Sequence, residues 1–221
     1  MCIRDRSYFL FPMRQRALER TLFPLGHLTK AEVRSKAEAF GLVTAHKPES
    51  QEICFIPDDD HARFVKEHRP DADGAGEIVD AQGQVLGEHD GYFRFTIGQR
   101  RGLNVALGRP VYVTRIEPET RRVVVGFADD LMHGGLKADR ANWFRRPEPD
   151  EVVMVRLRHR GKLVPCRVRE SAPEEPLFVD FLEEARAVAP GQAAVFYDGD
   201  TVLGGAWIRR SMPATNGRAA S

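Results

Sequence analysis

The distribution of apolar and polar residues divides the chain into a short helical part and a longer β-rich part. Between Val33 and Phe40, apolar residues recur at the spacing of one helix face. Thr29 and Glu32 precede this stretch in a capping-box pattern, and Gly41 follows it as a stop signal. The pattern therefore predicts a helix between Thr29 and Gly41. A second, shorter helix is expected after residues 58–60, with its end at Pro70.

From Gly74 onward, short apolar runs alternate with glycine, proline and other turn residues. These runs predict strands at 77–80, 84–86, 111–117, 121–126, 152–160, 163–169, 177–181, 193–197 and 202–208. The first four indicate a small β-rich domain. The later ones are short and regularly spaced, which favours a small β-barrel. The sequence thus predicts a mixed α/β fold that is mainly β.

Composition supports a folded chain and excludes several classes of protein. Of the 221 residues, 42% are hydrophobic, which is enough for a core, while 33 basic and 32 acidic residues nearly cancel. Three scattered cysteines without a Cys-x-x-Cys pair argue against a disulfide framework and a zinc ribbon. No apolar run is long enough to span a membrane, and Met1–Ser7 lacks the apolar segment of a signal peptide. We therefore expect a cytoplasmic protein without a membrane partner.

Cys54 is the first residue that could carry chemistry. It lies between Ile53 and Phe55, after a polar loop that contains Lys47. A reactive thiolate needs cationic neighbours or amide donors, and the sequence offers candidates without placing them. An ordinary buried cysteine is the alternative, because free cysteines are among the most buried residues.

Arginines are concentrated in the predicted strand at 152–160. On an ideal strand, Arg156, Arg158 and Arg160 would share one face at intervals of about 6.6 Å, which suits a row of phosphates. The segment Arg140–Arg169 holds nine Lys/Arg against three Asp/Glu, whereas Glu170–Glu184 holds six acids and no bases. Contact with RNA and a solvated strand face paired with those acids both remain open.

Three further features complete the candidates. Gly98 and Gly102 flank a Gln-Arg-Arg triplet that could meet a phosphate backbone or simply form a structural loop. The histidines lack metal-ligand spacing, so no metal site is expected. Cys166 alternates with Val164 and Val168, which predicts that it faces the barrel core.

Six segments together resemble the tRNA-specific 2-thiouridylase family. The similarity runs in order along the chain, and its most specific strings surround Cys54 and the Gln-Arg-Arg triplet. The segments are Ser7–Leu10, Leu22–Gly26, Lys47–Ile56, Thr96–Leu103, Pro190–Tyr197 and Leu203–Ile208.

The resemblance implies a sulfur-transfer reaction on tRNA. In this family, ATP, expected to act with Mg²⁺, adenylates the C2 oxygen of a wobble uridine. A cysteine persulfide then delivers sulfur to C2, and a second cysteine releases it by forming a disulfide. Cys54 matches the persulfide-bearing cysteine. A sulfur-relay protein or a cysteine desulfurase is implied as the donor.

The resemblance also implies residues that contact tRNA. Arg158 and His159 match a basic–aromatic pair, with histidine where tyrosine is common, and Gln192 matches a third contact. At the N-terminus, three more residues fall where a Lys-Asp-Gln triplet contacts tRNA, and only the aspartate is identical. These residues are Arg4, Asp5 and Arg6.

One departure from the family pattern is large. The family's ATP-binding Ser-Gly-Gly-Val-Asp-Ser loop does not occur in these 221 residues, and Cys2 does not lie in the motif of the other catalytic cysteine. The apolar run Tyr8–Phe11 lies almost at the start of the chain, which is typical of a fragment. A foreign origin of residues 1–7 is an alternative at this point. We therefore expect that the isolated chain does not thiolate tRNA.

Two rival hypotheses for the function remain. One is a non-catalytic RNA-binding module with a structural Cys54, and the other is an ATP-independent sulfur carrier.

The resemblance assigns a domain to each part of the chain. Residues 1–57 are expected to be the end of a PP-loop ATP-binding domain, and residues 58–130 a central β-rich domain. Residues 131–210 are expected to form a C-terminal β-barrel, and residues 211–221 a disordered tail.

Overall fold

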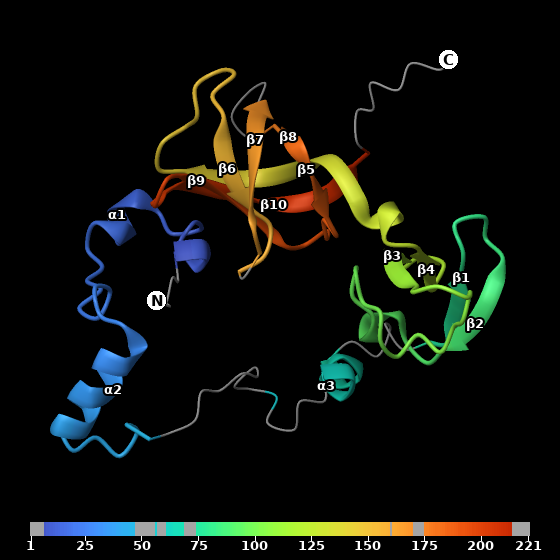
Figure 1. Cartoon of the computed structure of the whole chain (residues 1–221), viewed down its shortest axis with the longest axis horizontal. Coiled ribbons are helices and arrows are strands. Elements are labelled where there is room, and N and C mark those ends of the chain that lie inside the picture. Colours follow the sequence, from blue (N-terminus) through green and yellow to red (C-terminus); the bar gives the residue numbers. More distant parts are fainter. Residues whose placement is uncertain are drawn as a thin grey trace.

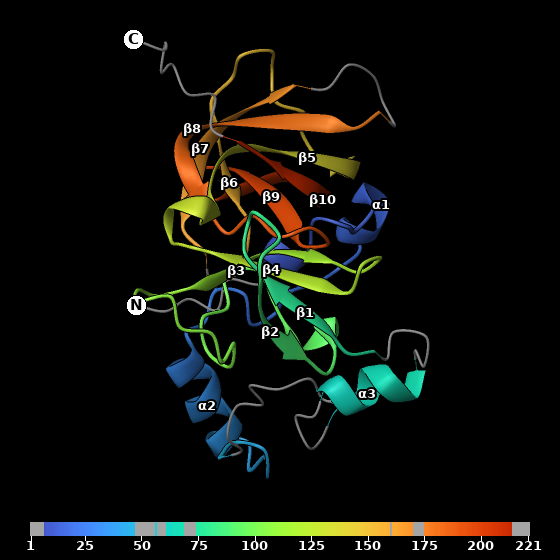
Figure 2. The ribbon, with the colours of Figure 1, turned by 90° about the vertical axis from the view of Figure 1, so that its right-hand side faces the viewer.

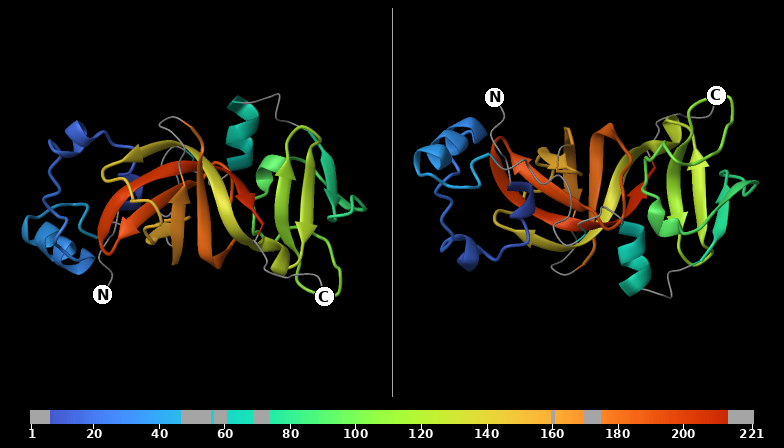
Figure 3. Two further views of the ribbon diagram at one scale, coloured as in Figure 1. Left: turned by 90° about the horizontal axis from the view of Figure 1, so that it is seen from above. Right: turned by 90° about the horizontal axis from the view of Figure 1, so that it is seen from below.

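A computed structural model describes residues 7–46, 56, 61–68, 74–159, 161–169 and 175–213. Three parts follow one another along the long axis of the molecule: a helical N-terminal segment, a β-barrel and a four-stranded sheet (Figure 1). Views from above and below give the same order (Figure 3). The barrel, formed by the C-terminal half of the chain, thus lies between two parts that precede it in sequence.

The helical segment contains a 3-10 helix at Ser7–Phe9, α1 at Gln15–Leu18 and α2 at Lys30–Ala39. The predicted capping box is present at the start of α2, where the Thr29 side chain accepts from the Glu32 N–H and the Glu32 carboxylate accepts from the Thr29 N–H. At its end, Gly41 adopts φ +64°. Its N–H donates to Glu38 O, and the next N–H donates to Ala37 O, which together form a Schellman motif. These local signals fix both ends of the helix.

The apolar side of α2 does not pack as its pattern suggests. None of the ten residues of α2 is buried, and Phe40 directly after it is 78% exposed. Helix α3, at His61–His68, comes next along the described chain and contacts the 3-10 helix Tyr92–Arg94. Within the described residues, no helix is long and apolar enough to cross a membrane.

The four-stranded sheet has the strand order β2-β1-β4-β3. It lies on the side of the molecule that is turned toward the viewer in Figure 2. Two antiparallel hairpins are joined by a parallel pairing of β1 with β4. Its core contains Ile78, Val113, Val123 and Val125, together with Leu103 from the loop that precedes β3. The strands are β1 Gly76–Val79, β2 Val85–His89, β3 Tyr112–Glu117 and β4 Arg122–Gly126.

The second β unit is a closed barrel with the strand order β10-β5-β8-β7-β6-β9, and neighbouring strands are antiparallel. The predicted mainly-β fold with a barrel is therefore confirmed. A 3-10 helix at Asp129–Leu131 leads into it. Leu136, Val155, Val179, Phe196 and Ile208 point into its core. The strands are β5 Met132–Trp143, β6 Val153–Arg156, β7 Leu163–Arg169, β8 Leu177–Arg186, β9 Ala193–Asp198 and β10 Thr201–Met212.

Several predicted elements differ from the structure, and β8 and β2 continue beyond their predicted ends to Arg186 and His89. The strand β5 was not anticipated, because glycines and charged residues interrupt its alternation; its pairing with β8 and β10 compensates. The strand predicted over 152–160 ends at Arg156, since the chain bends at residues 157–158 and turns at 159. Strand β10 extends two residues into the predicted tail, because Ser211 and Met212 pair with β5.

Strand β9 is buried on both of its faces. Ala194 and Phe196 point into the barrel, whereas Ala193, Val195 and Tyr197 belong to a cluster on its outside. Tyr8 and Phe11 cover this outer cluster, with exposed fractions of 5% and 3%. The N-terminal segment is therefore part of the barrel's packing, although nearly the whole chain separates them in sequence.

Candidate RNA-binding surface

Residues 7–13 are attached to the outside of the barrel by specific hydrogen bonds. The Tyr8 hydroxyl donates to Ala193 O at 2.9 Å. Burial raises the pKa of this phenol, although the hydrogen bond to Ala193 acts in the opposite direction. The Asn142 amide donates to Phe11 O at 2.5 Å and to Met13 O at 2.8 Å. These contacts fix the position of the aromatic side chains that the segment carries.

His159 lies against two of those aromatic side chains. Its ring centroid is 4.8 Å from that of Phe9 and 6.0 Å from that of Tyr8. Its Nδ1 atom is buried and has no hydrogen-bond partner among the residues that the structure describes. Phe9 is 58% exposed, so an aromatic side chain beside His159 is accessible to solvent.

Arg158 joins the barrel to the four-stranded unit. Its Nη2 atom donates to Ile97 O at 3.1 Å and to Ala187 O at 3.2 Å. At the same junction a Cβ added to Gly98 would approach the Ala187 Cβ to 3.1 Å, so the two backbones meet closely there. Arg158 is nevertheless exposed, and three of its five N–H donors lie on Nε and Nη1, outside these two bonds.

The predicted tRNA contacts that the structure describes converge around Tyr8. Its ring adjoins His159, and the charge of Arg158 acts on its hydroxyl. The carbonyl that it contacts belongs to Ala193, directly after the exposed Gln192. The Gln192 backbone is held by the bond from Ile208 N–H to its carbonyl at 2.8 Å. Arg158, His159 and Gln192 thus lie at one end of the barrel.

The predicted row of arginines on one strand face is wrong for Arg156 and Arg158, the two that the structure describes. Arg156 is the last residue of β6, and its guanidinium lies 5.0 Å from the centre of the Tyr197 ring. Arg158 follows in the bend and contacts carbonyl groups. Arg160 lies outside the described residues. Arg156 and Arg158 therefore do not lie on one continuous strand face.

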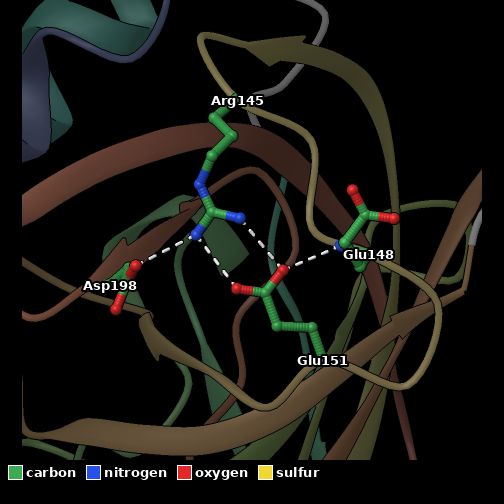
Figure 4. Close-up of polar contacts among 4 residues, drawn as sticks. All are labelled: Arg145, Glu148, Glu151 and Asp198. Carbon is green, nitrogen blue, oxygen red and sulfur yellow. Dashed lines mark hydrogen bonds and ion pairs between the residues drawn. The ribbon is translucent and has the colours of Figure 1, made fainter.

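Several other arginines of the basic segment are neutralised within the chain. Arg145 forms a two-pronged contact with Glu151, at 3.0 Å for each bond, and reaches Asp198 at 3.1 Å (Figure 4). The hydrogen bonds from Arg145 hold the pKa of the Glu151 carboxyl below its usual value. Arg169 makes a similar fork with Asp180, at 2.5 and 2.9 Å. Arg169 of β7 therefore pairs with Asp180 of the acidic segment, whereas the alternative left open from the sequence concerned the strand at 152–160.

The cysteines differ in what the structure says of them. Cys166 is fully buried in the barrel core, as predicted. Burial, with a smaller contribution from the Asp180 charge, raises the pKa of its thiol to about 12, so it is unreactive at neutral pH. Cys54 and the predicted contacts Arg4, Asp5 and Arg6 lie outside the described residues. Across the part of the chain that is described, no three His, Cys, Asp or Glu side chains gather to hold a metal ion.

Sequence reasoning missed the roles of Tyr8 and Asn142. A signal was present, because residues 193–197 form an unbroken apolar run, which indicates a strand covered on both faces. Tyr8 and Phe11, the ends of the apolar run 8–11, are the matching cover. Nothing in the sequence identifies Asn142 as the donor that holds it.

Known proteins match the chain in its three parts. Family models match residues 2–58 (tRNA methyl transferase HUP domain), 62–127 (tRNA methyl transferase PRC-barrel domain) and 133–208 (Aminomethyltransferase beta-barrel domain). A tRNA-specific 2-thiouridylase MnmA from Geotalea uraniireducens is 47% identical over 95% of this chain and 56% of its own length. The MnmA 2 protein of Syntrophus aciditrophicus is 45% identical over 95% of this chain and 68% of its own length. The chain belongs to the tRNA-specific 2-thiouridylase family.

The family models and the relatives differ in the reaction that their names give. The models are named for methyl transfer, whereas the relatives are named for thiolation. Each model matches about one third of the chain or less, while the relatives match nearly all of it, so the relatives identify the 2-thiouridylase family. The chain spans 57% of a third relative, from Geobacter metallireducens, at 46% identity. It thus covers little more than half the length of several family members.

Proposed function

We propose that this chain binds tRNA and delivers sulfur to it within a 2-thiouridylase that modifies the wobble uridine. The observation that carries the proposal is the identity of 45–47% with proteins named tRNA-specific 2-thiouridylase, over 95% of the chain. The convergence of Arg158, His159 and Gln192 around Tyr8 supports a binding surface at one end of the barrel.

Cys54 is the sulfur carrier in this proposal. Its persulfide forms through a sulfur-relay protein or a cysteine desulfurase. The terminal sulfur bonds to C2 of a uridine whose C2 oxygen has been activated, and that oxygen departs with its activating group. A thiolate from a second cysteine then attacks the sulfur of Cys54, which breaks the persulfide bond and leaves sulfur on C2. The two cysteines end as a disulfide.

The proposal assigns neither ATP nor Mg²⁺ to residues of this chain. The sequence has no Ser-Gly-Gly-Val-Asp-Ser loop to hold phosphates, and the described residues contain no cluster of metal ligands. Uridine activation is therefore assigned to no residue here. We expect the 221-residue chain alone to form no 2-thiouridine, and an ATP-dependent 2-thiouridine product made by it would contradict this.

The surface around Tyr8 offers both kinds of contact that a tRNA needs. The exposed Phe9 ring with His159 can stack on an unpaired base, which is the usual way that single-stranded RNA is held. The Nη1 and Nε groups of Arg158 and the amide of Gln192 can bond to phosphate or base edges. Arg4, Asp5 and Arg6, which lie outside the described residues, are proposed as further tRNA contacts by their positions in the family pattern.

Persulfide formation tests the role of Cys54 directly. The chain is incubated with a cysteine desulfurase and cysteine, and peptides are analysed by mass spectrometry. We expect one added sulfur atom on the peptide that contains Cys54 and none on the Cys166 peptide, because burial keeps the Cys166 thiol protonated. Cys54→Ser is the control. If no sulfur is added to the Cys54 peptide, the hypothesis of a non-catalytic RNA-binding module is favoured instead.

Two further measurements separate the rival functions. A sulfur-carrying thiolate should be alkylated well below the usual thiol pKa of about 8.5, whereas a buried structural cysteine should not. The chain that carries the Cys54 persulfide is then titrated with tRNA and, separately, with a protein sulfur acceptor, and binding and sulfur transfer are measured. Binding to tRNA supports the 2-thiouridylase role. A chain that transfers sulfur to protein and ignores tRNA is an ATP-independent carrier.

A further inference from the structure

A short loop of the four-stranded unit is held rigidly with two arginines at its tip. The Gln99 side chain accepts from Thr96 N–H at 3.0 Å and donates to Arg101 O at 2.9 Å, so it closes the loop on itself. Gly98 and Gly102 adopt φ +86° and +75°, which a residue with a Cβ rarely adopts. The loop conformation is thus built into the sequence around Arg100 and Arg101.

The same loop is fixed to both β units. Gly98 N–H donates to Val113 O at 2.8 Å, and Val113 N–H donates to Gln99 O at 2.9 Å, which ties the loop to β3. On the other side, Arg158 of the barrel donates to Ile97 O. Because residues 97–99 contact both β units and the Gln99 side chain bonds to Arg101 O, the loop presents its tip in a defined position relative to the surface around Tyr8.

Arg100 and Arg101 differ from three other arginines of their unit, Arg94, Arg115 and Arg122, whereas Arg109 lies over the Phe127 ring. Arg94, Arg115 and Arg122 each pair with a carboxylate, at 3.1, 2.7 and 3.0 Å. Arg100 and Arg101 are exposed, and no side-chain hydrogen bond or ion pair is recorded for them within the described residues. Two adjacent guanidinium groups without a carboxylate form a local positive site on a chain of net charge +1.

We propose that Arg100 and Arg101 bind backbone phosphates of the tRNA, so that the RNA footprint spans both β units. The inference rests on the proposed function. Arginine suits this task because its planar fork donates two parallel hydrogen bonds to a phosphate. Arg158 then serves as a positioning residue for the loop in addition to its own contact. Rigid presentation lowers the ordering cost of binding.

The salt dependence of tRNA binding by the full chain tests this. Affinity is measured between about 50 and 200 mM salt for the wild type and for the double variant Arg100→Ala/Arg101→Ala. Loss of two phosphate contacts should reduce the slope of log K against log salt by about 1.5. Arg100→Lys/Arg101→Lys should keep most of the slope, since it keeps both charges.

Arg115→Ala/Arg122→Ala is the matched control, because it removes two ion-paired arginines from the same unit. It should leave the slope unchanged, and circular dichroism melts should show that all variants fold. An unchanged slope in the Arg100/Arg101 alanine variant, or an equal loss in the control, would overturn the inference while leaving tRNA binding intact. A wild type that does not bind tRNA would refute the proposed function instead.

Discussion

The Tyr8 hydroxyl donates a 2.9 Å hydrogen bond to the carbonyl of Ala193, a residue 185 positions away. This bond joins the N-terminal segment to the strand that follows Gln192. It places Phe9 and Tyr8 beside His159, and it covers the outer face of β9. The proposed tRNA surface therefore depends on contacts between the two ends of the sequence.

Tyr8→Phe should lower the free energy of unfolding by about 1–2 kcal/mol, because a buried carbonyl loses its donor while the ring still packs. Urea denaturation measures the change. Tyr92→Phe is the matched control, since the described residues record no hydrogen bond for the Tyr92 hydroxyl. Equal stability of wild type and Tyr8→Phe would mean that the bond does not hold the segment.

Asn142→Asp should destabilise the attachment more than Asn142→Ala does. A carboxylate in place of the amide would face the carbonyls of Phe11 and Met13 without a proton to donate, at a cost of about 3 kcal/mol. Lowering the pH should restore part of the loss by protonating the aspartate. Urea denaturation at two pH values measures both effects, and Asn104→Asp on an exposed loop controls for added charge. Equal stability of the two Asn142 variants would contradict the assigned role.

The buried thiol of Cys166 should make the protein less stable at high pH. Burial raises its pKa from 9.0 to about 12, so above pH 9 the unfolded state loses this proton first. The stabilising contribution is complete below pH 9 and declines as the pH rises toward 12. Between pH 9.5 and 11 the wild type should lose stability by up to about 1.4 kcal/mol per pH unit more than Cys166→Ala. Parallel pH profiles of the two proteins would rule out this linkage.

Arg158→Ala should weaken tRNA binding and reduce its salt slope by about one phosphate, or 0.7–0.9. Arg158→Lys keeps the charge but loses the fork to Ile97 and Ala187. Hydrogen exchange at the Gly98 amide should then become faster while the salt slope stays close to that of the wild type. Arg169→Ala, which removes an arginine paired with Asp180, is the control. An unchanged slope in Arg158→Ala would remove this phosphate contact.

Local signals in the sequence were enough for elements whose ends are set by nearby residues. The capping box at Thr29 and the glycine stop at Gly41 both predicted the ends of α2. Regular alternation predicted most strands and the inward orientation of Cys166. The family strings predicted the candidate site residues around the barrel end.

The sequence by itself determined the class of fold, the ends of α2, the inward orientation of Cys166 and the family. Only the tertiary structure decided that β5 is a strand, that Arg158 bonds to Ile97 and Ala187, and that Tyr8 lies beside His159. The physical reason is the range of the interactions. Hydrogen bonds and packing within a helix turn or a strand depend on neighbouring residues, whereas these pairings form between segments that folding alone brings together.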